Sequence, residues 1–106
     1  MENKANEKEL RDQTIKLLHE HGILRNMEIA KLQVQHIDNS FFLIRIQRGD
    51  RIFRVSVTPK ITENLKLLVQ GKEFDDFLFP SARNKDKHIS HTMVKKIIDN
   101  YKMEVA

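Results

Sequence analysis

Arginine side chains give this sequence its clearest chemical character. Arg25 directly follows an apolar turn, Gly22-Ile23-Leu24, and precedes a segment in which apolar residues have helical spacing. Free N–H groups and the positive end of a helix favour negative charge, so an arginine there is placed to face a bound anion. Four more arginines recur at every third position, at Arg45, Arg48, Arg51 and Arg54. Guanidinium groups bind phosphate through paired hydrogen bonds, which makes a phosphate-bearing partner the first hypothesis.

Two helices are predicted around the first of these arginines. Residues 1–8 are polar and expected to fray, and helix-forming residues dominate from about Glu7 to His21. Gly22 should end that helix as the residue beyond its C-cap. Asn26 is the expected N-cap of a short second helix, with Glu28 complementing the dipole in its first turn. The alternative to an anion site here is an ordinary capped surface helix.

The periodicity changes between Phe41 and Val57. Apolar residues alternate there on both sides of a break at Gly49-Asp50, which is typical of a β-hairpin. The hairpin carries the four later arginines on its strands and tip. They form either a charged edge that resists aggregation or a cationic finger that lies on a phosphate backbone.

Two more helices are predicted after the hairpin, so the fold class is mixed α+β. Thr58 and Pro59 form a strong helix start, followed by an apolar stripe that Gly71 ends. Phe74 and the apolar segment 77–80 are expected to form buried aromatic packing. Ser90 is the expected N-cap of the last helix, which places its apolar residues on one face and Lys95 and Lys96 on the other.

The composition suits one soluble globular domain with a polyanionic partner. The chain has 106 residues, 40% hydrophobic and 32% charged, with a net charge of +4 and a pI near 9.5. Clustered positive charges release counterions from nucleic acid, which favours such a partner. Apolar runs are too short to span a membrane, and neither a signal peptide nor a cysteine is present. We therefore expect a cytoplasmic protein with no membrane partner, disulfide or cofactor.

The segment after Gly22 resembles the first conserved motif of the tyrosine recombinase (phage integrase) catalytic domain. That motif reads Gly-Leu-Arg-x-x-Glu-Leu-x-x-Leu-x-x-x-Asp-Ile. Arg25 takes the position of its first catalytic arginine, and Glu28, Leu32 and Ile37 follow at the family's spacing. Gly22 departs from the motif, because it lies one residue too far upstream. The resemblance implies that Arg25 is a vestigial catalytic arginine, partly buried, turned toward DNA and held in place by Glu28.

The hairpin resembles a second recombinase motif, Lys-Gly-x-Lys-x-Arg. The sequence resembles this motif at Gly49, Arg51, Arg54 and the closing Val55-Ser56-Val57, but at positions 48 and 51 arginine stands in place of the motif's lysines. A lysine can lose its proton to a leaving oxygen, whereas arginine stays charged at any usable pH. Arg48 and Arg51 are thus suited to hold a phosphate and poor proton donors.

The resemblance extends from about Asp12 to Tyr101 and implies a domain over residues 9–106 like the front part of a recombinase catalytic domain. Its fold would pack helices around a small antiparallel hairpin or three-stranded sheet. In the family the last helix approaches DNA. The resemblance therefore adds His88 and His91, at the start of that helix, to the candidates for phosphate contact. The expected DNA-binding residues are Arg25, Arg45, Arg48, Arg51, Arg54, His88, His91, Lys95 and Lys96. A metal shared by the two histidines is the alternative, but no third ligand is evident.

Strand cleavage is not expected from this chain alone. The family's His-x-x-Arg motif and tyrosine nucleophile would lie beyond Ala106, and Tyr101 falls on the apolar face of its helix, as a core residue does. Three hypotheses follow. In the first, the chain is a truncated or degenerate recombinase-type protein of a phage or mobile element that binds duplex DNA. In the second, it is a fragment of an active site-specific recombinase. In the third, it is a protein-interaction module that associates with a recombinase or with itself and does not bind DNA.

Overall fold

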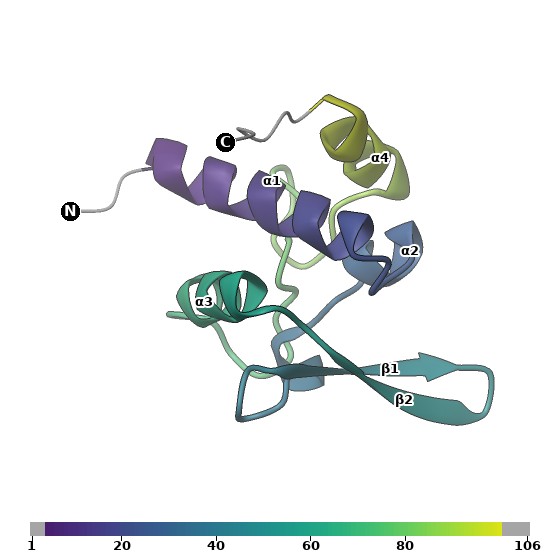
Figure 1. The fold of residues 1–106 in the computed structure, drawn as a ribbon. Helices are drawn as coiled ribbons and strands as arrows, with labels where there is room; N and C mark the ends of the chain where they lie inside the picture. Colours follow the sequence, from purple (N-terminus) through teal and green to yellow (C-terminus); the bar gives the residue numbers. More distant parts are fainter. Residues whose placement is uncertain (1–3, 101–106) are drawn as a thin grey trace, which may run out of the picture.

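A two-stranded hairpin extends from a group of helices in the computed structural model, which describes residues 4–100, with side chains from Glu7 onward (Figure 1). The elements are α1 (Lys4–Glu20), α2 (Asn26–Ala30), the 3-10 turn η1 (Val34–His36), β1 (Leu43–Arg48), β2 (Arg51–Ser56), α3 (Pro59–Leu68) and α4 (His91–Asn100). The α+β class is confirmed. None of the described helices combines the length and apolar character needed to cross a lipid bilayer. The expectation for Tyr101 lies outside the described residues.

The first helix packs an apolar stripe into the core and ends as its sequence predicts. Ile15 and Leu18 are fully buried. Gly22 has a φ of 64° and donates its N–H to the His19 carbonyl at 2.9 Å, while the Ile23 N–H reaches the Leu18 carbonyl at 3.1 Å. A left-handed residue followed by a bond back across five residues closes a helix in the Schellman manner. The helix begins at Lys4, three residues before the expected start.

The second helix starts one residue earlier than predicted. Arg25, and not Asn26, is its N-cap, with extended dihedral angles of −79° and 160°. The Glu28 carboxylate accepts the Arg25 N–H at 2.9 Å, so the glutamate satisfies a backbone donor at the helix start. The helix ends at Ala30, because the chain then pairs with a distant segment: the Val34 N–H donates to the Asp76 carbonyl at 3.0 Å.

The hairpin packs against the core through its first strand, β1. Ile44 and Ile46 of β1 are buried, whereas every residue of β2 except the half-buried Val55 is exposed. Gly49 has a φ of 65° at the first position of the two-residue turn, where type II′ turns place glycine. The outer part of the hairpin therefore extends beyond the helices, with β2 open to solvent (Figure 1).

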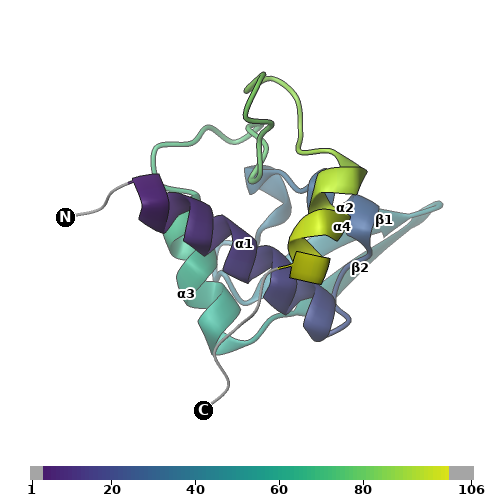
Figure 2. The ribbon, with the colours of Figure 1, turned by 90° about the horizontal axis from the view of Figure 1, so that it is seen from above.

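The helices after the hairpin begin at the predicted caps. The Thr58 hydroxyl accepts the Ile61 N–H at 3.2 Å, and the Ser90 hydroxyl accepts the Met93 N–H at 3.0 Å. Both helices contact α1, which runs between them when the molecule is seen from above (Figure 2). The arrangement places α4 and the hairpin on opposite sides of α1 and α2 in Figure 1.

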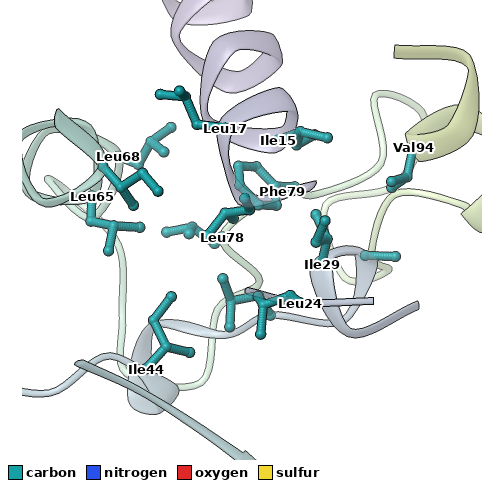
Figure 3. Packing of buried hydrophobic residues seen from close by; sticks show 14 of the residues in the cluster. Ile15, Leu17, Leu24, Ile29, Ile44, Leu65, Leu68, Leu78, Phe79 and Val94 are labelled. Carbon is teal, nitrogen blue, oxygen red and sulfur yellow. The ribbon is translucent and has the colours of Figure 1, made fainter. Parts of the chain in front are cut away.

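The aromatic residues before α4 separate into core and surface. Phe79 is fully buried and lies at the centre of the packed side chains in Figure 3, whereas Phe74 is 69% exposed. The prediction of buried packing is confirmed for Leu78 and Phe79 and wrong for Phe74. The main chain of Phe74 has the structural role, since its carbonyl accepts the Gln35 N–H at 2.9 Å while its side chain points outward.

Candidate nucleic-acid interface

The hairpin divides its four arginines between its two faces. Arg45 lies directly opposite Arg54, and Arg48 lies directly opposite Arg51. Opposed residues share a face and successive residues alternate, so the two pairs point to opposite sides of the hairpin. The four arginines therefore form two separate pairs on opposite faces, and the hypothesis of a single cationic finger is corrected accordingly.

Arg48 is occupied by an ion pair within the protein. Its Nε and Nη2 atoms donate to the two oxygens of Glu28 at 2.7 and 2.8 Å, and its guanidinium lies 5.9 Å from the centre of the Phe53 ring. The hydrogen bond from Arg48 is the main reason that the pKa of Glu28 lies below its ordinary value. This paired geometry ties the hairpin to the start of α2. Arg48, which was predicted to contact phosphate, thus has a structural partner within the protein.

Arg25 lies at the start of α2, as predicted, but its side chain is exposed and not partly buried. The expected contact with Glu28 exists through the Arg25 backbone N–H, whereas the Glu28 carboxylate holds the guanidinium of Arg48. Because that carboxylate binds the Arg48 guanidinium, it does not bind the Arg25 guanidinium. Glu28 contacts both arginines, so Arg25 lies near the Arg48 side of the hairpin.

On the Arg45–Arg54 side of the hairpin, the Arg45 side chain reaches η1. Here we define the cationic face as Lys31, His36, Arg45 and Arg54. The Arg45 Nη2 atom donates to the Gln35 carbonyl at 3.3 Å, which holds this guanidinium against η1. A hollow of about 300 Å³ between α2 and β1 is lined by Lys31, His36 and Arg45, and an adjoining hollow reaches Arg54.

Few acidic groups balance this face. Among residues 7–100, neither Arg45 nor Arg54 is in a salt bridge, and the same holds for Arg51 at the tip. Asp38 is the acidic residue beside Arg54, and hydrogen bonds from Ser40 are the main cause of its lowered pKa. Two like charges directly opposite each other destabilise a strand pair. The cationic face can therefore hold an anion that relieves this repulsion.

The candidates near α4 form a separate group. His88 is half-buried, with its ring edge-on to Phe77 at 5.5 Å and its Nδ1 atom 2.6 Å from the Ile89 carbonyl. The Lys95 Nζ atom lies 3.7 Å from the Asp99 Oδ2 atom, whereas His91 and Lys96 are exposed. Because α4 and the hairpin lie on opposite sides of the helices, the structure does not unite these four residues with the arginines (Figure 1). Within the described chain, no group of three or more metal-ligating side chains occurs.

Two members of the cationic face, Lys31 and His36, are missing from the sequence-based set. The sequence predicts a short capped helix from Asn26, and no local signal places either side chain near the hairpin. The isolated bridge between Ile37 and Ile44 brings the end of η1 beside β1. A comparison with protein-family models and a comparison with curated proteins both find no match to this sequence.

Replacing Glu28 by glutamine is expected to lower Tm by a few degrees at pH 7, because the Arg48 ion pair and its charge are lost. The folded-state pKa of Glu28 lies below its ordinary value of 4.5, so the ionised form stabilises the fold. That contribution is complete above about pH 4.5 and disappears as the pH falls through the lowered pKa. Thermal unfolding of the wild-type protein and of Glu28→Gln at a series of pH values should show that their Tm difference disappears at low pH.

Glu63 provides the matched control, because it is exposed on α3 and, within the described chain, is in no salt bridge. Glu63→Gln should leave Tm almost unchanged at every pH. An equal loss in both variants would show that overall charge, and not the Arg48 contact, accounts for the effect.

Proposed function

We propose that this protein binds duplex DNA without cutting it and that the cationic face makes the contact. In this proposal it is a recombinase-type protein of a phage or mobile element, acting in the cytoplasm. The observation that carries the proposal is the pair Arg45–Arg54, two arginines at directly opposed positions of the hairpin with no salt-bridge partner in the described chain. A phosphate backbone supplies the negative charge that this pair lacks.

The shape of the hairpin supports the same partner. A two-stranded ribbon fits the major groove of B-form DNA, and β2 is open to solvent along its length. Arg54 lies on the ribbon, Lys31 lines the hollow beside β1, and the exposed Arg51 lies at the tip of the ribbon. Contacts of these side chains with phosphate position a protein on a duplex without reading bases. We therefore infer weak binding with little sequence preference.

The same residues argue against strand cleavage by this chain. Arg48 is held by Glu28, and a guanidinium is a poor proton donor to a leaving oxygen. Arg25 remains the vestigial counterpart of a catalytic arginine, available only for phosphate contact. Binding without cleavage is what this set of side chains can perform.

The test is a salt titration of binding to a fluorescent duplex, followed by anisotropy. We expect a dissociation constant in the micromolar range or weaker near physiological salt, similar for two unrelated sequences. The logarithm of the binding constant should fall linearly with the logarithm of salt concentration, by about 0.9 for each phosphate contact. Absence of binding at low salt, or binding that salt does not weaken, would contradict the proposal and favour the protein-interaction hypothesis.

A further inference from the structure

We propose that His36, Arg45 and Arg54 form a pocket for one phosphate group, in which the imidazole Nε2–H donates a hydrogen bond to a phosphate oxygen. The ligand class is a phosphate diester, and its source is the backbone of duplex DNA. This inference rests on the proposed function and deepens it, because it assigns the central phosphate contact to a residue outside the arginine pattern.

The tautomer of His36 follows from its backbone partner. The Gln33 N–H donates to the Nδ1 atom of His36 at 3.0 Å. Nδ1 is therefore an acceptor, and a neutral imidazole that accepts at Nδ1 carries its proton on Nε2. Burial, and then the neighbouring Arg45 charge, lower the pKa of His36, which keeps the ring neutral at pH 7. The ring thus presents a fixed N–H donor.

That donor is open to solvent. Within the described residues, Nε2 of His36 has no hydrogen-bond partner, and no buried side-chain nitrogen or oxygen lacks one. Nε2 must therefore be accessible. His36 lines three adjoining hollows, and Arg45 lines the same three. His36 and Arg45 consequently border a shared space.

Three different elements contribute to this space. His36 is the last residue of η1, Arg45 lies on β1, and Arg54 lies opposite it on β2. The Gln35 carbonyl anchors Arg45 at 3.3 Å, so its guanidinium is held beside the histidine. A phosphate offers several acceptor oxygens and negative charge, which match one neutral donor and two guanidinium groups.

A pair of substitutions separates the structural role of Nδ1 from the binding role of Nε2. His36→Asn keeps an acceptor near the Nδ1 position for the Gln33 N–H but removes the distal donor. His36→Gln keeps a distal N–H donor and loses the acceptor. We expect His36→Asn to retain its Tm and to bind duplex roughly ten- to a hundredfold more weakly, as the loss of one hydrogen bond to a charged group implies. His36→Gln should lose Tm and retain more of the affinity.

Imidazole ¹⁵N spectra of the full wild-type chain provide a readout that needs no variant. The neutral Nε2–H form should appear at pH 7, and its Nε2 resonance should shift when a duplex without terminal phosphates is added. A smaller, saturable shift is expected with inorganic phosphate, and duplex added to the phosphate-saturated protein should replace it with the larger duplex shift. A response to inorganic phosphate but not to the duplex would overturn DNA as the source.

The remaining outcomes decide between the inference and the function on which it rests. Wild-type affinity in His36→Asn, with no shift of Nε2 on duplex addition, would overturn the pocket while salt-dependent DNA binding still stood. An Nε2 atom that responds to neither ligand, in a protein that binds no duplex, would overturn both. Weakened binding in His36→Asn at unchanged Tm, together with a shifted Nε2 resonance, would establish the pocket.

Discussion

Replacing Phe79 by alanine is expected to lower the free energy of unfolding by about 3–5 kcal/mol, the usual cost of removing a buried phenyl ring. Phe79 is fully buried and lies at the centre of the packed side chains between α1, α2 and α3 (Figure 3). Its neighbours come from different elements and cannot all move in to fill the space, so a cavity would remain. Single domains are stable by roughly 5–15 kcal/mol, and this one change removes a large share.

Phe74→Ala is the matched control for that experiment. Phe74 precedes Phe79 by five residues in the same segment but is 69% exposed, so its removal should change stability by less than about 0.5 kcal/mol. Urea denaturation of both variants, with the slope held in common, measures the difference. Similar losses in the two variants would contradict the described core.

Replacing Arg45 and Arg54 together by glutamine is expected to have the largest effect on DNA binding. Because the two guanidinium groups hold one phosphate in this proposal, their loss should make the salt slope shallower by about 0.9. The loss of affinity between 50 and 200 mM salt would then shrink by roughly three- to fourfold relative to wild type. The fold should tolerate the change, because it removes an unfavourable pair of like charges. Anisotropy titrations at several salt concentrations measure the slope directly.

Two further sets of variants show whether the salt slope depends on the position of the arginines or only on the net charge. Lys66→Gln with Lys85→Gln removes two exposed charges outside the hairpin and should leave the salt slope nearly unchanged. Arg48→Gln should also leave it nearly unchanged, because Glu28 already neutralises that guanidinium. If all three variants flatten the slope in proportion to the charge removed, binding is a property of net charge and not of the cationic face.

Much of the fold could be predicted because its signals are local. Gly22, Thr58 and Ser90 act through bonds to residues within a few positions, and each one ends or begins its helix as predicted. The hairpin follows from an alternating pattern on both sides of a two-residue turn. The division of the arginines was also readable, since a turn at Gly49-Asp50 places Arg48 opposite Arg51 and Arg45 opposite Arg54.

The rest depends on contacts between distant parts of the chain. Glu28 stands three residues from Arg25 and twenty from Arg48, and the nearer arginine is its obvious partner in the sequence. Packing of β1 against the end of η1 brings Arg48 and His36 into place instead. Phe74 and Phe79 have the same side chain and neighbouring positions, so no local signal separates the buried ring from the exposed one.

The most direct test of DNA binding by the cationic face is a titration of the ¹⁵N-labelled chain with a short duplex, followed through its backbone amide resonances. We expect the largest shifts in residues 31–36 and in β1 and β2 around Arg45 and Arg54. Residues of α3, and Lys95 and Lys96 on α4, should remain almost unchanged. Shifts centred on α4, or a spectrum that the duplex does not alter, would contradict the proposed interface.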